Sequence, residues 1–406
     1  MILLLGVPLC LANGWVGPHV DEAGAVSSAD FRAAYVLGPD STTAVIQSGV
    51  DTDVRRFAWL LPVPAPLVQD RVAKVAPEVM DALIAGTDPR YTWTTGCGLN
   101  LAGMYGCRAD GTDTAASAGV DLLRELDVGP YEVAVLDAKV GADVTGWLAD
   151  HGYRVSAELE PVLDGYLAEG WILLAVALDL EELPLGSGAL PALAFTYQST
   201  KVAYPIRISA GSANSEVETV VFTIGPTATA PQGEAWVVPE VGQDFVGDDF
   251  AAWYQGVARA ALARQQGRAW LLEYSRYGQG IYDDQRRWTT DDAALDLISA
   301  LTELELIEAD RMEGGAVLTR YRTWLSPAQM ETDLVLVPDD TVPETVLELH
   351  GFQEALLKFL PLLVWPLRRR RVAPRRVSTE GGPTERGPTE GGPTERGLHS
   401  GPVVPP

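Results

Sequence analysis

Histidine and cysteine are scarce in this chain of 406 residues, and acidic side chains outnumber basic ones. The histidines are His19, His151, His350 and His399, and the cysteines are Cys10, Cys97 and Cys107. So few histidines leave little material for a His-rich metal site or a His-based catalytic triad. The formal net charge of −25 disfavours nucleic acid as a partner, because proteins bind phosphates through Lys and Arg. The same charge opposes adsorption of the body to an anionic lipid surface.

The familiar catalytic motifs are also missing. The chain contains no Gly-X-Ser-X-Gly elbow, P-loop or dinucleotide fingerprint, so we predict no cofactor-binding or metal-binding residue and the catalytic residues stay unknown. A glycosidase needs two carboxyl groups facing each other across a cleft. Neighbouring acidic residues are expected by chance in a chain with 55 of them, and they occur at Glu158 and Glu160, Glu181 and Glu182, Asp248 and Asp249, and Asp283 and Asp284.

Two further residue types have a structural explanation. His151 follows Asp150 at the expected end of a helix, where the helix dipole favours a protonated imidazole without any catalytic role. The eleven tryptophans could line a sugar-binding face, but tryptophan more often fills a core. Four of them occupy positions typical of a core: Trp59, Trp147, Trp171 and Trp270.

The N-terminal residues predict export. Met1 to Leu11 are apolar, and the small residues Cys10 and Ala12 fit a signal-peptidase site with cleavage before Asn13. Acylation of Cys10 and a buried first strand are the alternatives. Removal of residues 1–12 leaves two cysteines, Cys97 and Cys107, and in an oxidising compartment we expect a disulfide between them. A thiolate metal site is the weaker alternative, since no histidine lies near this pair.

The stretch Phe57 to Pro66 predicts a buried strand that three alternating prolines end. Before it, Ala33 to Leu37 and Thr43 to Gln47 read as a hairpin. After it, the apolar spacing predicts helices over 72–84, 141–151, 161–168, 245–265, 291–304 and a short one opened by Ser326-Pro327. Strands are predicted over 131–136, 171–178, 192–197, 206–210, 218–224, 270–274, 317–324 and 334–337. Trp171 to Leu178 is an almost wholly apolar run, which indicates a central strand covered on both faces.

The C-terminal part changes in composition. Leu356 to Leu367 is apolar but contains Lys358 and two prolines, and the arginines Arg368 to Arg371 follow at once. A spanning helix needs about 20 apolar residues, so this run is either a short anchor with a basic cytoplasmic end or an amphipathic terminal helix. Beyond it, a five-residue repeat of the type Thr-Glu-Gly-Gly-Pro predicts disorder.

Several segments follow one another in a specific order: Phe57 to Pro64, Val135 to Ala138 with Trp147-Leu148 and Gly152-Tyr153, Pro161 to Leu178, Leu193 to Gly225 with Pro205-Ile206-Arg207-Ile208, Leu318-Thr319-Arg320, and Ser326-Pro327 with Met330 to Leu334. Together they resemble a bacterial family of unknown function, DUF2330. The resemblance spans most of residues 13–337. It implies an extracytoplasmic protein with a leader and a C-terminal hydrophobic segment followed by basic residues. It implies no activity and no catalytic residue.

We therefore expect an α+β fold, with a mixed or largely antiparallel sheet, inserted helices and a disordered C-terminal tail. The expected division is a signal peptide at 1–12, a core domain at 13–240, a helix-plus-strand part of the same body at 241–340, an apolar segment with arginines at 341–371 and the repeat tail at 372–406.

The first functional hypothesis is an exported cell-envelope protein, periplasmic or secreted, that acts as a non-catalytic binding or structural module. Its expected partner is an envelope protein or ligand, with membrane association through the apolar segment. The alternative is a carboxylate-dependent hydrolase acting on envelope carbohydrate.

Overall fold

The computed structural model describes residues 14–23, 26–94, 126–127, 131–136, 138–179, 186–212, 216–242, 245, 249–265, 268–278, 280–281 and 315–352. The predicted signal peptide, Cys97, Cys107, the apolar segment from Leu356 and the repeat tail lie outside these residues. All elements described below belong to the unit that ends at Phe352.

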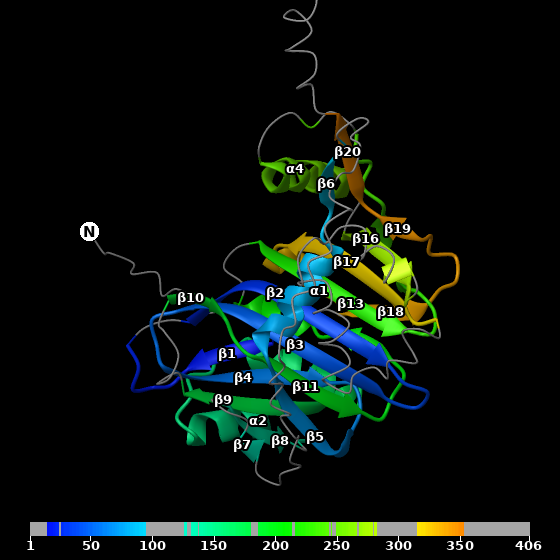
Figure 1. Cartoon of the computed structure of the whole chain (residues 1–406). Coiled ribbons are helices and arrows are strands. Elements are labelled where there is room, and N and C mark those ends of the chain that lie inside the picture. The colour runs from blue at the N-terminus through cyan, green and yellow to red at the C-terminus, as the bar shows by residue number, and fades with distance from the viewer. Residues whose placement is uncertain are drawn as a thin grey trace, which may run out of the picture. The chain divides into compact units, whose positions relative to one another are not determined.

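Two large sheets form the body (Figure 1). The first has five strands in the order β1 (Trp15–Pro18), β4 (Arg56–Val63), β9 (Ile172–Asp179), β8 (Tyr131–Leu136) and β7 (Leu126–Asp127). The second has ten: β15 (Ala235–Val237), β16 (Ala269–Tyr277), β17 (Val317–Leu325), β13 (Val217–Gly225), β2 (Val26–Leu37), β3 (Thr42–Thr52), β11 (Ala192–Tyr197) and β5 (Leu67–Val75) in that order, with β10 (Gly186–Ala189) on β3 and β19 (Thr345–Val346) on β16.

Smaller elements complete the described part. A three-stranded sheet has the order β12 (Val202–Tyr204), β18 (Leu334–Pro338) and β14 (Thr229–Pro231), and a two-stranded parallel ribbon joins β20 (Glu348–Phe352) to β6 (Arg90–Thr94). The helices are α1 (Pro77–Thr87), α2 (Gly141–Asp150), α3 (Leu159–Ala168) and α4 (Phe250–Ala263), with 3₁₀ turns η2 (Arg207–Ser212) and η4 (Pro327–Gln329). Most strand pairs are antiparallel, so the predicted α+β class with a mixed sheet is confirmed.

The apolar stretch from Phe57 forms β4, whose two faces are both buried. Phe57, Trp59 and Leu61 point into the main core between the two large sheets. Ala58 and Leu60 point to the opposite face, which α2 and α3 cover. Because neither face meets water, the strand carries no alternating polar residue. Its neighbour β9 lies between β4 and β8, which confirms the central position predicted for Trp171 to Leu178.

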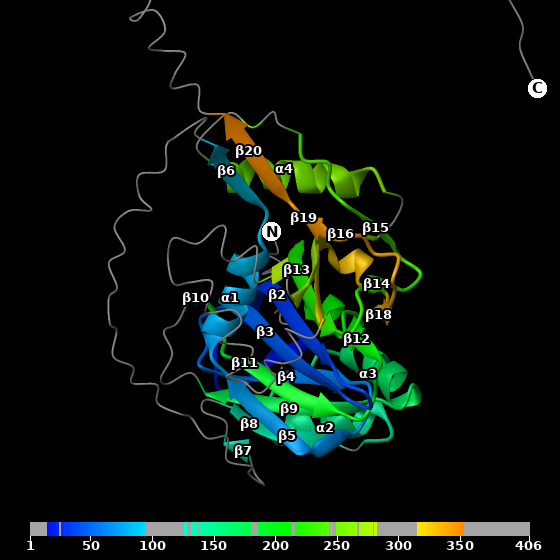
Figure 2. The same cartoon turned by 45° about the vertical axis from the view of Figure 1, so that its right-hand side comes forward.

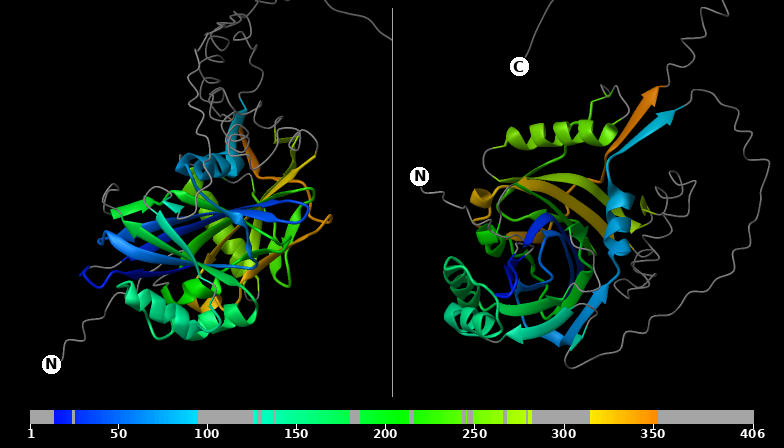
Figure 3. Two further views of the ribbon diagram at one scale, coloured as in Figure 1. Left: turned by 90° about the horizontal axis from the view of Figure 1, so that it is seen from below. Right: turned by 90° about the vertical axis from the view of Figure 1, so that its left-hand side faces the viewer.

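The outer face of the ten-stranded sheet is covered by two helices at different places (Figure 3). One apolar cluster there includes Val79, Met80 and Leu83 of α1. A separate cluster includes Tyr254 and Ala258 of α4, packed on Leu271 of β16. The part of this face between the two clusters is the part that holds charged side chains.

Two predicted elements were wrong. The helix predicted over 72–84 is a strand up to Val75, and α1 begins only at Pro77. Val72 and Val75 are three residues apart, a helical spacing, but in a strand they point to opposite faces and enter different cores. The strand predicted over 206–210 is η2. The backbone N–H of Arg207 donates to the side chain of Asp333 at 2.9 Å, so no strand partner is needed there.

Candidate functional site

Six charged residues cross the outer face of the ten-stranded sheet, perpendicular to the strands. We call this set the charged row. It extends from β2 through β13 and β17 to β16 and consists of Asp30, Arg32, Glu218, Arg320, Arg322 and Glu273. Strand pairing brings the members together: Glu218 lies beside Asp30 in the parallel β13–β2 ladder. The row therefore contains residues that are far apart in the sequence.

β-Bulges place two of the carboxylates. The β16–β17 register shifts between Leu272 and Tyr274, so Glu273 is the extra residue of a bulge. The β2–β3 register shifts between Ser28 and Phe31, which leaves Asp30 in a second irregular stretch. Bulges re-aim side chains and are frequent beside functional sites. Two of them at opposite ends of one charged row identify this face as the candidate site.

The buried end of the row is centred on Glu273, whose side chain is 0% exposed. Its Oε2 lies 3.1 Å from Nε of Arg320 and 3.0 Å from Nε of Arg322. Its Oε1 accepts a hydrogen bond of 2.6 Å from the hydroxyl of Tyr254, which α4 supplies. Burial, followed by the charge of Glu273, raises the pKa of Tyr254, so its hydroxyl keeps its proton and acts as the donor.

The C-terminal end of α1 contacts the charged row on the outer face of the sheet. Oδ1 of Asp88 lies 2.6 Å from Nη2 of Arg320 and 2.9 Å from Nη2 of Arg322. Arg320 also donates to the hydroxyl of Thr87 at 3.0 Å and to the carbonyl of Ile84 at 3.3 Å. The guanidinium groups thus satisfy backbone and side-chain acceptors at the end of the helix. The charged row thus connects α1, α4 and four strands through ion pairs and one tyrosine hydrogen bond.

The open end of the row contains Glu218, Asp30 and Arg32. Oε1 of Glu218 lies 3.1 Å from Nη1 of Arg322. Arg32 lies 2.9 Å from Asp30 and 2.8 Å from Asp81 of α1. Burial raises the pKa of Glu218; Glu273 and Asp30 act in the same direction, while Arg322 and Arg320 oppose them. Glu218 therefore takes up a proton more readily in the folded protein than an ordinary glutamate does.

Glu218→Gln gives a prediction for the pH dependence of stability. The pKa of Glu218 in the folded protein lies above its ordinary value of 4.5, so the folded state binds this proton more tightly than the unfolded state. The wild type should gain stability relative to the variant as the pH falls from neutral towards 4.5. Urea unfolding midpoints of both proteins across this range measure the difference, with exposed Glu132→Gln as a control for net charge. A wild type that loses stability relative to Glu218→Gln as the pH falls would contradict a raised pKa of Glu218.

A second ion-paired cluster joins three segments that carry the family resemblance: Pro161 to Leu178, Leu193 to Gly225 and Met330 to Leu334. Arg207 lies 2.8 Å from Oδ2 of Asp333, whose Oδ1 accepts from the hydroxyl of Tyr166 at 2.7 Å. Arg207 also lies 2.7 Å from Glu169 and over the ring of Tyr166. These contacts fasten α3 to η2 and to the start of β18. The role that they support is structural, because every charge is already paired.

The residues singled out in the sequence are dispersed. Trp59, Trp171 and Trp270 are buried as predicted, whereas Trp147 is half-buried and stacks on His151 at 3.9 Å. The ring Nδ1 of His151 lies 2.7 Å from the carbonyl of Trp147 at the end of α2. Of the paired acids, Glu158 and Glu160 are exposed and Asp249 caps α4. The others lie outside the described residues: Glu181, Glu182, Asp248, Asp283 and Asp284.

The charged row was missed, although a signal for it exists. Arg320 and Arg322 interrupt a strand that is otherwise apolar or neutral, and Glu273 interrupts its neighbour. Charged residues are rarely buried unless they are paired, so charges at such positions indicate a buried network. What the sequence could not supply is the pairing of these strands.

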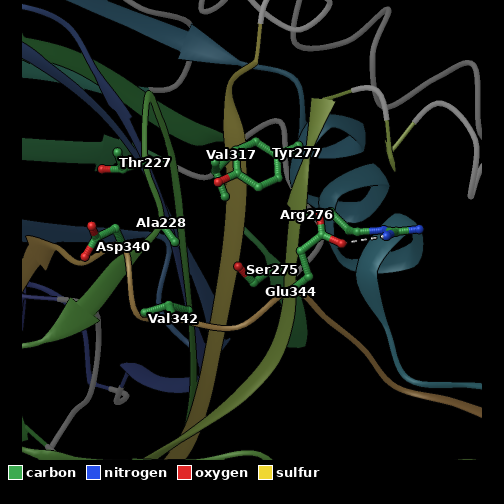
Figure 4. Close-up of a pocket in the computed structure, with 9 residues that line it drawn as sticks. All are labelled: Thr227, Ala228, Ser275, Arg276, Tyr277, Val317, Asp340, Val342 and Glu344. Atoms are coloured by element: carbon green, nitrogen blue, oxygen red, sulfur yellow. Dashed lines mark hydrogen bonds and ion pairs between the residues drawn. The ribbon is translucent and has the colours of Figure 1, made fainter.

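A small cavity lies between β16, β17 and the segment after β18 (Figure 4). Its volume is about 40 Å³, and the buried Ser275 and Val342 line it together with the Arg276–Glu344 ion pair of 3.1 Å at its side. A water occupies roughly 10–15 Å³ on this measure, so the cavity holds a few waters and is too small for a sugar ring. No group of three or more metal-ligating side chains is found among the described residues.

The described part of the chain thus defines an α+β protein with a buried ion network on one sheet face. The chain belongs to a family described as uncharacterized proteins conserved in bacteria, DUF2330, which matches residues 16–253. No curated protein matches it. The crystal structure of baculovirus P35 is similar with a TM-score of 0.29 and 11% identity, covering 51% of this chain and 67% of the other. No described helix is long and apolar enough to cross a membrane.

Proposed function

We propose that this protein is an exported component of the bacterial cell envelope whose body acts as a non-catalytic binding or structural module. The observation that carries this proposal is the state of the charged row. Glu273 is fully buried between two guanidinium groups and a tyrosine hydroxyl, and Asp88 contacts both guanidinium groups. A general acid or base must reach the proton that it transfers, and Glu273 cannot reach a substrate.

The hydrolase alternative would have to use the open end of the row. Glu218 has the raised pKa that suits a general acid, and Asp30 lies beside it. Each of these carboxylates, however, is held by an arginine: Arg322 for Glu218 and Arg32 for Asp30. They lie next to each other on one sheet face, whereas a glycosidase places its two carboxyl groups on either side of a substrate. This arrangement favours a structural role for the row.

Export rests on the N-terminal residues and on the cysteine pair. The apolar run to Leu11 and the small residues Cys10 and Ala12 support cleavage before Asn13. Cys97 and Cys107 support maturation in an oxidising compartment. The partner would be an envelope protein or ligand, with Leu356 to Leu367 and the arginines after it bringing the protein to the membrane.

Cell fractionation followed by mass analysis of the purified protein tests this proposal. We expect the protein in the envelope or periplasmic fraction, with the mass of residues 13–406 less two protons for the Cys97–Cys107 disulfide. Incubated with purified envelope polysaccharide, the same preparation should release no reducing ends. Recovery from the cytosol with Met1 attached and with Cys97 and Cys107 open to alkylation would overturn the export proposal. Reducing ends that disappear with Glu218→Gln would establish the hydrolase instead.

A further inference from the structure

The exposed face of α4 differs in charge from the rest of this acidic protein. Each of α1, α2 and α3 contains two acidic residues, whereas α4 itself contains none and neither do the two residues after it. The exposed acidic residues that touch this helix are its N-cap Asp249 and Glu216, which forms an ion pair with Arg259. Its exposed positions are Ala251, Ala252, Gln255, Gly256, Arg259, Ala260, Ala263 and Arg264. A helix that combines small apolar side chains with arginine suits an anionic lipid surface. The net charge of −25 opposes such contact for the body as a whole.

Aromatic side chains gather beside this face. The ring of Phe245 lies 4.8 Å from Tyr91 of β6, 5.5 Å from Phe250 and 5.5 Å from Trp253 of α4. Phe250, Trp253 and Tyr91 are only partly buried. Tryptophan and tyrosine are enriched where proteins meet the headgroup region of a bilayer, because their rings are apolar with a polar tip.

The chain leaves the described body at the same end (Figure 2). β6 and β20 are parallel, and Phe352 lies beside Thr94, so both strands end together. The apolar run begins at Leu356, four residues after Phe352, and the arginines start at Arg368. Four residues of extended chain reach at most about 14 Å. If the apolar run enters a membrane, the end of β20 and its neighbour α4 must lie close to the lipid surface.

We propose that the exposed face of α4, together with its aromatic neighbours Tyr91, Phe250 and Trp253, is the surface by which the body rests on an anionic lipid bilayer. The inference rests on the membrane association proposed above and adds which side of the body faces the lipid.

Two glycines provide a matched test. Gly256 in α4 and Gly146 in α2 are both exposed helical positions where an added Cβ meets nothing within 4 Å. Gly256→Cys and Gly146→Cys are made separately in the full chain and labelled with an environment-sensitive dye, with the unsubstituted protein labelled in parallel to subtract the background. Each is mixed with vesicles of equal phosphatidylcholine and phosphatidylglycerol that carry a quencher on their acyl chains.

We expect quenching of the dye at position 256 and none at position 146. Ala251→Glu with Ala260→Glu should lower vesicle partitioning by about fivefold for each added charge, and the same change at Ala142 and Ala149 of α2 should not. Equal quenching at both positions, or quenching at 146 alone, would overturn the assignment of the face while membrane association stands. A full chain that fails to sediment with the vesicles would overturn both. Export would still be decided by fractionation.

Discussion

A chain that ends at residue 253, where the family match ends, is expected to lack a cooperative folded state. This truncation removes β16, β17 and β18, although β17 pairs with β13 along nine residues, from Val217↔Leu325 to Gly225↔Val317. It also removes a set of large buried side chains from the main core: Trp270, Leu272, Tyr321, Leu325, Leu334 and Leu336. Burying a large apolar side chain contributes about 1.5–3 kcal/mol, so the loss is comparable with or larger than a typical domain stability of about 5–15 kcal/mol.

Urea unfolding followed by circular dichroism measures this result. The control is a chain that ends at residue 352, which retains every described element and should unfold in one steep transition. The shorter chain should show a shallow, non-cooperative change. If it unfolded steeply near the midpoint of the longer chain, the folding unit would coincide with the family match and the last strands would be dispensable.

Replacing Glu273 with leucine is expected to lower the free energy of unfolding by about 3–5 kcal/mol. The substitution removes the buried one of the two carboxylates that Arg320, which is 0% exposed, and Arg322, which is 14% exposed, share. It leaves them only Asp88 as a common partner, and the side chain of Asp88 is 43% exposed. It also leaves the hydroxyl of Tyr254 without its acceptor. The cost comes from the charges that stay buried rather than from the lost attraction.

A second variant separates the cost of the arginine charges that stay buried from the loss of their attraction to Glu273. Glu273→Leu combined with Arg320→Leu removes one of the two buried guanidinium charges that have lost Glu273. The double variant should therefore be more stable than Glu273→Leu alone. Glu344→Ala is the matched control, because it breaks an ion pair to Arg276 whose carboxylate is 53% exposed and should cost less than about 1 kcal/mol. Urea midpoints give all three values. A Glu273→Leu protein within 1 kcal/mol of the wild type would show that water reaches the network.

Prediction from sequence succeeded where a single segment decides its own structure. Phe57 to Val63 is apolar on both faces, so it had to be a buried strand. Ser326-Pro327 opens η4 because the serine hydroxyl and the proline ring both favour a helix start. α2 ends where predicted because Gly152 adopts a φ of +81° beside His19, where another side chain would be strained and crowded.

Prediction from sequence failed where contacts with a distant segment determine the local structure. The spacing of Val72 and Val75 predicts a helix, but both residues lie in a strand because β11 pairs with them. Ile206 to Ala210 reads as a strand until Asp333, 126 positions from Arg207, accepts the backbone N–H of that arginine. The charged row failed for the same reason, since Glu218, Glu273 and Arg322 meet only after β13, β16 and β17 have paired.

The sequence by itself determined the family, the α+β class and the position of the most buried strand, because apolar patterning and proline act over a few neighbouring residues. Only the tertiary structure decided which carboxylate meets which arginine, and that α4 presents a face without acidic residues beside the end of β20. Charge interactions depend on distance in space, and the ladders of the ten-stranded sheet set those distances.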